Sequence, residues 1–208
     1  MKVKPILEAC VETLEQALLA ERSGADRIEL CADLSVGGLT PNQELLEQIQ
    51  KHLTIPIMAM ARPRGGNFCY SSEEQEKIKE AINLFKKLKI KGVVFGFLTK
   101  KNKIDISLTK AMVAHASPLE VTFHKAIDST PDPVKAVKEL SRIKGVNRIL
   151  TSGGKSTASE GVDTLRRMKE AGGQQLNIIV AGKVTKENLP ALHQQIRANE
   201  YHGRRIVF

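Results

Sequence analysis

The run KPILEAC at residues 4–10 is short and largely apolar, and it recurs in kind along the chain. Seven further runs follow it: RIELC at 27–31, IPIMAMA at 55–61, GVVFGFL at 92–98, LEVTFH at 119–124, RILT at 148–151, NIIVA at 177–181 and a weaker EYH at 200–202. Most neighbouring runs are separated by a stretch with the apolar period of a helix, which indicates βαβ units and a parallel sheet. Eight such units predict an α/β fold, a TIM-type (β/α)8 barrel.

The eighth unit is predicted to be short. After His202 only residues 203–208 remain, which are too few for an eighth helix. No linker or low-complexity tract interrupts the 208 residues, so we expect a single domain over residues 1–208. Helix starts are predicted at Thr40-Pro41 and at Ser71, where Glu74 completes the spacing of a capping box.

The three cysteines, Cys10, Cys31 and Cys69, are an odd number spread over separate units, which favours reduced thiols over a disulfide framework. No apolar stretch is long enough to span a bilayer, and the N-terminus lacks the pattern of a signal peptide. We therefore expect a cytoplasmic protein without membrane association. Cys69 lies in a polar loop with no evident partner and is left out of the candidate site.

The formal net charge of +9 raises the question of nucleic-acid binding. Much of the excess comes from lysines that alternate with apolar residues in one predicted helix and its exit: Lys77, Lys79, Lys86, Lys87, Lys89 and Lys91. That pattern is typical of a solvated helix face, and no aromatic platform accompanies it. We expect no nucleic-acid partner, whereas the positive field favours small anions or an acidic partner.

Acidic and sulfur side chains end the first two predicted strands. In TIM barrels the chemistry gathers at the C-terminal ends of the strands. Because side chains alternate along a strand, Glu8 shares a face with Cys10, and Glu29 shares one with Cys31. A carboxylate that projects into a barrel is costly unless it meets a cation or a proton. We therefore predict Glu8 and Glu29 as candidate catalytic groups.

Further polar groups follow later runs. Arg62 has the fixed fork that suits a carboxylate partner or an anionic ligand, and Arg64 follows it closely. His124 ends the fifth run, and Asp128 is predicted to orient it. The other candidates for ligand binding are Gly153, Gly154, Gly182, Lys183 and His202. The glycines would let backbone N–H groups approach a ligand, and the lysine would add a cation in the usual phosphate-binding quarter of a barrel.

Taken together, these motifs resemble the CutC family of copper homeostasis proteins. The resemblance rests on LEAC at 7–10, GADRIELC at 24–31, GGLTP at 37–41, RPRGG at 62–66, VVFG at 93–96, TFH at 122–124, Asp128 and RILTSG at 148–153. It implies a cytosolic TIM-type barrel, usually a homo-oligomer, that is linked to copper handling and proposed to bind Cu(I) through cysteine. No enzymatic reaction is firmly attached to the family. The chain departs from the family pattern at Lys125, at Lys183 and in its short final segment, which bears on His202.

Two functions are compatible with these residues. In the first, the thiolates of Cys10 and Cys31 hold Cu(I), a soft ion, at the barrel mouth. Buried cysteines also serve as small apolar residues, so a structural role stays open.

In the second, the chain is an enzyme of the lyase, aldolase or isomerase type that acts on a small anionic or phosphorylated metabolite. Its catalytic groups would be Glu8, Glu29, Arg62, His124 and Asp128. Alternatively, these charges neutralise one another around the barrel opening. The sequence leaves open whether the chain is an enzyme.

Overall fold

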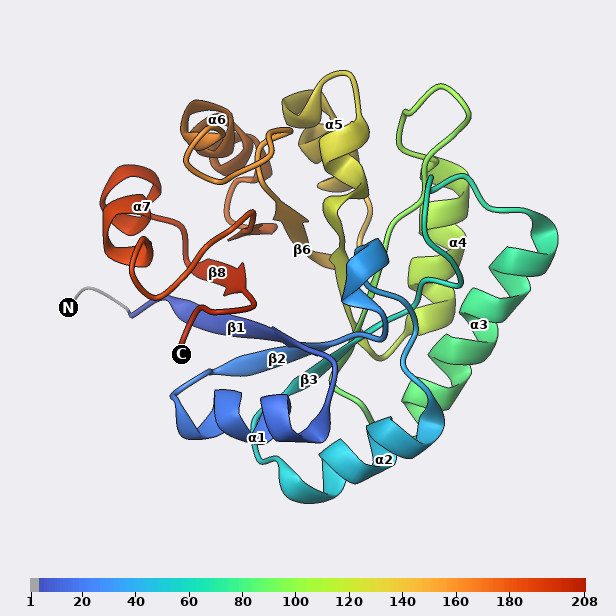
Figure 1. Ribbon diagram of the computed structural model, residues 1–208. Coiled ribbons are helices and arrows are strands. Elements are labelled where there is room, and N and C mark those ends of the chain that lie inside the picture. The colour runs from blue at the N-terminus through green and yellow to red at the C-terminus, as the bar shows by residue number, and fades with distance from the viewer. Residues whose placement is uncertain (1–3) are drawn as a thin grey trace.

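Residues 4–208 are described by a computed structural model. They form a closed barrel of parallel strands in the order β1 to β8, with β8 paired to β1 (Figure 1). The strands are β1 Ile6–Val11, β2 Arg27–Leu30, β3 Ile57–Met60, β4 Gly92–Phe95, β5 Glu120–Phe123, β6 Val146–Thr151, β7 Asn177–Val180 and β8 Glu200–Gly203. The predicted TIM-type barrel is confirmed.

Helices surround the barrel and connect successive strands (Figure 1). They are α1 Leu14–Arg22, α2 Gln43–His52, α3 Ser72–Lys87, α4 Ile106–Ala116, α5 Pro133–Leu140, α6 Val162–Gly172 and α7 Leu189–Ile196. Two 3-10 helices, η1 Leu34–Val36 and η2 Lys125–Ser129, follow β2 and β5. Within residues 4–208 no helix follows β8, as the short final segment predicts. None of the helices in this range is long and apolar enough to cross a bilayer.

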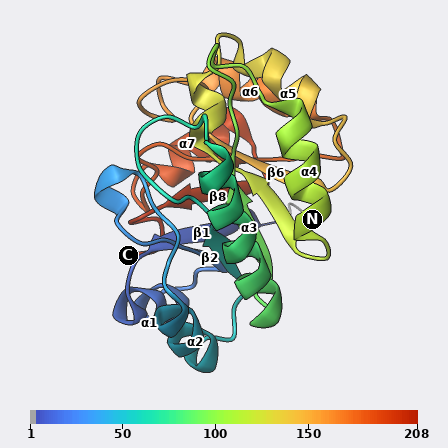
Figure 2. The same ribbon diagram turned by 90° about the vertical axis from the view of Figure 1, so that its right-hand side faces the viewer.

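The strand residues alternate between two packed regions. Outward side chains such as Ile28 and Leu30 join the helices in one large core. Inward side chains form smaller clusters inside the barrel: Cys10, Cys31, Leu34, Met58, Met60 and Val94 in one, and Leu150, Ile179 and Ala181 in another. The candidate site therefore lies on an apolar layer. Figure 2 shows the mouth of the barrel, marked by η1, on the side opposite the N-terminus.

The predicted helix starts agree in part with the structure. Ser71 and Glu74 form the capping box at the start of α3, as predicted. The start predicted at Thr40-Pro41 is wrong, because α2 begins at Gln43 with Asn42 as its N-cap. The Thr40 hydroxyl is instead hydrogen-bonded to the backbone of Arg62, which ties the loop after β2 to the end of β3.

Candidate functional site

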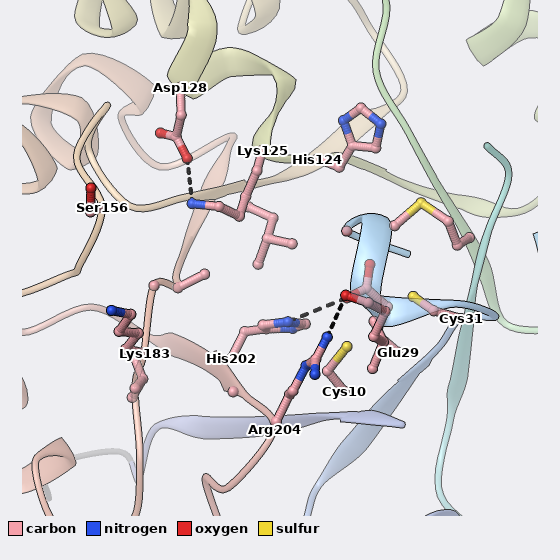
Figure 3. Close-up of a pocket in the computed structure, with 18 of the residues that line it drawn as sticks. Cys10, Glu29, Cys31, His124, Lys125, Asp128, Ser156, Lys183, His202 and Arg204 are labelled. Atoms are coloured by element: carbon pink, nitrogen blue, oxygen red, sulfur yellow. Dashed lines mark hydrogen bonds and ion pairs between the residues drawn. The ribbon is translucent and has the colours of Figure 1, made fainter. Parts of the chain in front are cut away.

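Three neighbouring strands bring the acidic and sulfur side chains together at the mouth. The register pairs Cys10 of β1 with Glu29 of β2, and Glu8 of β1 with His202 of β8. Glu8, Cys10 and Glu29 are buried, and 12% of the His202 side chain is exposed. Figure 3 shows Cys10, Glu29 and His202 converging in the pocket. The closure of β8 onto β1 thus places residues from both ends of the chain in one site.

His202 bridges the two buried carboxyl groups. Its Nδ1 lies 2.8 Å from Oε1 of Glu8, and its Nε2 lies 3.3 Å from Oε2 of Glu29. Burial opposes the charge on Glu8, but Arg27 and His202 lower its pKa to about 2. Burial raises the pKa of Glu29 well above its usual value. Although burial also opposes a charge on His202, its acidic neighbours raise its pKa. Glu8 meets a cation, whereas burial favours the neutral form of Glu29.

The two cysteine thiols lie against this bridge. The sulfur atoms of Cys10 and Cys31 and a carboxyl oxygen of Glu29 all lie within 4.8 Å of one another. The hydrogen bond from Cys31, aided by His202 and opposed by burial, lowers the pKa of Cys10 to about 5. The same hydrogen bond raises the pKa of Cys31, as does burial. At neutral pH the pair therefore consists of a Cys10 thiolate and a Cys31 thiol.

A chain of ion pairs, buried at Glu8, Arg27 and Glu200 and more exposed toward its other end, supports the site from below. Arg27 donates to Oε2 of Glu8 and, at 2.6 Å, to Oε2 of Glu200. Arg148 continues the chain at 3.1 Å from Glu200 and 2.6 Å from Glu120. Lys91 ends it at 2.7 Å from Glu120. The side chain of Arg27 is buried inside the barrel.

Arg62 has backbone carbonyl groups as partners instead of the predicted carboxylate or anion. Its guanidinium donates to the carbonyl oxygens of Val36, Gly38 and Gly66 at 2.9, 3.1 and 3.0 Å. These bonds hold the loop that contains η1 over the barrel mouth. Its Nε is buried and has no partner among residues 4–208. The guanidinium also stacks on the ring of Phe68, with 5.0 Å between its central carbon and the ring centroid.

His124 stacks on the same Phe68 ring, with 4.9 Å between centroids. Its Nδ1 accepts a hydrogen bond from the backbone N–H of Ala126, which places the ring proton on Nε2. Nε2 is buried and unpartnered within the described part of the chain. Burial, together with the Arg62 charge, lowers the pKa of His124 to about 3, so the ring is neutral at physiological pH.

Asp128 does not orient His124, in contrast to the prediction. Its carboxylate accepts hydrogen bonds from the hydroxyl groups of Thr151 and Ser152, the backbone N–H groups of Ser152 and Gly154, and Nζ of Lys125. Asp128 therefore fastens η2 to the loop after β6. The sequence spacing of four residues suggested a contact with His124, but the side chain turns toward the neighbouring strand.

The glycines after β6 and β7 mainly allow close packing of the chain. The N–H groups of Gly153 and Gly154 already donate to Thr151 and Asp128, and of the two glycines the cavity wall includes Gly154. A Cβ on Gly153 would lie 2.8 Å from the carbonyl oxygen of Gly161. A Cβ on Gly182 would lie 2.7 Å from the Cβ of Ser152 and 3.0 Å from the backbone nitrogen of Ala158. Such approaches leave no room for a side chain.

The mouth contains a cavity of about 940 Å³. Of the predicted site residues, the cavity wall includes Cys10, Glu29, Cys31, Arg62, His124, Asp128, Gly154, Gly182, Lys183 and His202. Glu8 lies beneath it, behind His202. Arg64 was predicted to bind ligand, but it is not part of the wall. Its guanidinium pairs with Glu74 and donates to the backbone of Asn67 and Cys69, which organises the loop before α3.

Four cationic residues of the wall were not predicted as site residues: Lys125, Lys155, Arg204 and Arg205. Lys155 follows the Gly153-Gly154 pair, and the two arginines follow His202 directly in the chain. These residues could have been identified from the sequence, because they follow the ends of predicted strands. Arg204 donates to the carbonyl oxygen of Leu34 at 2.6 Å, so the final segment reaches across the mouth to η1.

Comparison with known proteins assigns a family to these features. A model of the CutC family matches residues 5–207. The human copper homeostasis protein cutC homolog is 41% identical over 197 residues, which cover 95% of this chain and 72% of the human protein.

Two solved structures extend the comparison. A CutC structure from Streptococcus agalactiae superimposes with a TM-score of 0.92 at 30% identity, over 98% of this chain and 100% of that chain. Dihydrodipicolinate synthase from Bacillus anthracis gives a TM-score of 0.67 at 14% identity, over 98% of this chain and 70% of that chain. The second likeness concerns the barrel fold alone.

Proposed function

Because the chain belongs to the CutC family, we propose that it acts in copper homeostasis by binding Cu(I) through Cys10 and Cys31. The observation that carries this proposal is the pair of buried cysteine sulfurs at the ends of adjacent strands, within 4.8 Å of each other. Copper is here the cargo of the protein.

The chemistry of the sulfur pair suits a soft ion. Cu(I) prefers thiolate and thioether ligands to oxygen. Cys10 offers a thiolate, because its pKa is lowered to about 5, and binding of the ion would displace the proton of Cys31. Met58 and Met60 belong to the same buried cluster and shield the sulfurs from water. Glu29 is an oxygen donor that suits harder ions, so we assign it no bond to Cu(I).

The test is an anaerobic Cu(I) titration in competition with a calibrated chelator. The wild type is expected to bind one equivalent, Cys10→Ser and Cys31→Ser to bind about 100-fold more weakly, and the double variant to bind none. Cys69→Ser is the matched control, since Cys69 lies outside the cavity wall. Equal Cu(I) binding by the wild type and the double variant would contradict the proposal and leave the cysteines a packing role.

A second candidate function is favoured by the size of the cavity, which exceeds what a metal ion needs. The chain would then be a lyase, aldolase or isomerase that acts on a small anionic or phosphorylated metabolite. Glu29 is its best acid, because it is buried at the wall and burial raises its pKa. Glu8 would hold His202 in place, and Arg62, His124 and Asp128 would shape the pocket.

The enzyme candidate is tested by incubating the protein with a mixture of cell metabolites and following depletion by mass spectrometry. A metabolite consumed by the wild type and spared by Glu29→Gln would support an enzyme. Glu47→Gln on α2 serves as a control for the same substitution outside the cavity wall. Identical profiles for the wild type and Glu29→Gln would count against it.

We further propose that the protein is cytoplasmic and forms a homo-oligomer, as the family resemblance implies. Nucleic acid and membranes are not among the partners we propose. Native mass from light scattering after size exclusion tests the assembly: a mass that is a multiple of 22.9 kDa is expected, and a value of 22.9 kDa would exclude an oligomer at the concentration used.

A further inference from the structure

Three cations of the cavity wall, Lys155, Lys183 and Arg205, have side chains without an ion-pair or hydrogen-bond partner in the range 4–208. They come from the loops after β6, β7 and β8, three successive strands. We call these three residues the cationic rim. Unpaired like charges at one edge attract anions.

The acids of the wall do not neutralise the cationic rim. The wall contains Glu29, Asp128 and Glu160. Glu29 is buried beside His202, and Asp128 is occupied by η2 and the loop after β6, whereas six lysine and arginine residues line the same wall. Glu160 accepts a hydrogen bond at 3.1 Å from the backbone N–H of Thr157. The cavity therefore carries a net positive charge that faces an open volume.

The backbone holds Lys183 in a costly conformation at this edge. Its φ of +56° lies in the left-handed region that non-glycine residues rarely adopt, and it follows Gly182 with a φ of +100°. Two hydrogen bonds fix the turn: Ala158 N–H to the Gly182 carbonyl at 2.8 Å, and Asn188 Nδ2 to the Lys183 carbonyl at 2.9 Å. Conformations of this kind concentrate at functional sites.

The far wall of the cavity offers hydrogen-bond donors that lack acceptors. Nε of Arg62 and Nε2 of His124 are both buried and unpartnered in the described range, and both side chains pack on Phe68. Buried donors without acceptors are rare in folded proteins. The two side chains belong to the cavity wall, so their unpartnered donors lie beside the open volume that a ligand would occupy.

We propose that the cavity binds a small organic anion, whose phosphate or carboxylate group lies at the cationic rim and whose second polar end, an acceptor oxygen, meets Arg62 and His124. A volume of about 940 Å³ accommodates such a molecule. This proposal rests on the second candidate function and says where in the cavity the two ends of its anionic ligand lie, and it is independent of copper. Phosphate and carboxylate share the chemistry that the rim recognises, and the experiment separates them.

The first test is calorimetric titration of the metal-free protein with inorganic phosphate and, separately, with malonate. We expect at least one probe to saturate a single site, and Lys155→Gln/Lys183→Gln to bind it about tenfold more weakly. Lys77→Gln/Lys87→Gln removes the same charge from the exposed face of α3 and should bind like the wild type. A stronger response to phosphate identifies phosphate esters, and a stronger response to malonate identifies carboxylates. The proposal is overturned when neither probe saturates, or when the rim and control variants bind equally.

The second test uses 2-phosphoglycolate, which carries a phosphate group at one end and a carboxylate at the other, so that both ends of the proposed site are examined at once. The wild type should bind it about tenfold more tightly than inorganic phosphate, and His124→Asn should lose that gain while retaining phosphate binding. Asparagine retains an acceptor for the Ala126 N–H, and His124→Phe provides a second variant with a ring against Phe68. The proposal would be overturned if the wild type bound 2-phosphoglycolate no more tightly than inorganic phosphate. Cys10→Ser/Cys31→Ser should bind both probes like the wild type, which separates this site from the copper proposal.

Discussion

Glu8 and Glu29 have the same side chain and similar burial, yet their surroundings shift their pKa values in opposite directions. Arg27 and His202 hold Glu8 as an anion, with a pKa of about 2, despite its burial. Glu29 has His202 alone at 3.3 Å, and burial raises its pKa. Paired carboxyl groups with divergent pKa values are typical of sites that move protons. The sequence shows two equivalent Glu-x-Cys motifs, so this difference arises entirely from the tertiary neighbours.

A first prediction concerns the reactivity of Cys10. Replacement His202→Gln removes a positive charge beside the thiolate, so the pKa of Cys10 should rise from about 5 toward the ordinary thiol value. The measurement is the pH dependence of iodoacetamide alkylation at Cys10, followed by peptide mass spectrometry in a Cys69→Ser background. His193→Gln, on α7, is the control and should retain the wild-type profile. An unchanged profile in His202→Gln would show that Cys31 alone sets the reactivity.

A second prediction concerns acid sensitivity through His124. The folded protein holds this histidine neutral with a pKa of about 3, whereas the unfolded chain takes up a proton near 6.5. Its contribution to stability is therefore complete above pH 6.5 and is lost as the pH falls toward 3. Between pH 6.5 and 5 the free energy of unfolding should fall by about 1.5 kcal/mol more in the wild type than in His124→Asn. Urea unfolding at the two pH values measures this, with His52→Asn as an exposed control. Equal losses would mean that His124 is protonated in the fold.

At the scale of elements, the strands β1, β2, β5, β6 and β8 are joined inside the barrel by alternating charges. Arg27 of β2 and Arg148 of β6 each bridge two glutamates, and Glu200 of β8 is shared by both. Buried charges of this kind are costly to separate, because each loses its partner without regaining water. The chain therefore fixes how these strands sit relative to one another beneath the thiol site.

A third prediction follows for Arg27. Arg27→Met leaves the carboxylates of Glu8 and Glu200 buried with one partner fewer, so the free energy of unfolding should fall by about 3–5 kcal/mol. Chemical denaturation at pH 7 provides the value. Lys79→Met removes an exposed ion pair with Glu76 on α3 and should change stability by about 0.5 kcal/mol or less. If the free energy of unfolding fell by a similarly small amount in both variants, the ion pairs inside the barrel would not be needed for stability.

The elements also show what the sequence could predict. All eight apolar runs became strands, because alternation and β-branched residues report local preference directly. The inward placement of Glu8, Cys10, Glu29 and Cys31 followed from the same alternation. The contacts of the loops could not be predicted in this way. The partners of Arg62, Asp128 and the Gly153-Gly154 pair depend on how one loop folds over the next. No spacing in the sequence encodes that arrangement.

At the scale of the whole molecule, the site exists because the barrel closes. His202, near the end of the chain, lies between Glu8 and Glu29 because β8 pairs with β1. Arg204 then reaches η1 across the mouth. The residues of the site are separated by up to 194 positions in sequence, so any loss of closure should remove the histidine from the thiols and the carboxyl groups together.

A fourth prediction tests this closure at Gly203, the last residue of β8. A Cβ there would lie 2.1 Å from the carbonyl oxygen of Val184, which is backbone and cannot give way, so Gly203→Ala must displace β8 or the loop after β7. We expect a loss of about 3 kcal/mol in the free energy of unfolding. Because His202 moves with β8, the pKa of Cys10 should rise as in His202→Gln.

Gly173→Ala is the matched control for the change at Gly203. Its φ of +62° imposes backbone strain, but a Cβ there meets nothing within 4 Å, so the loss should be about 1 kcal/mol with an unchanged alkylation profile at Cys10. Denaturation together with alkylation distinguishes the two variants. If Gly203→Ala destabilised the fold while Cys10 retained its low pKa, the thiolate would not depend on barrel closure, and its ionisation would have to come from β1 and β2 alone.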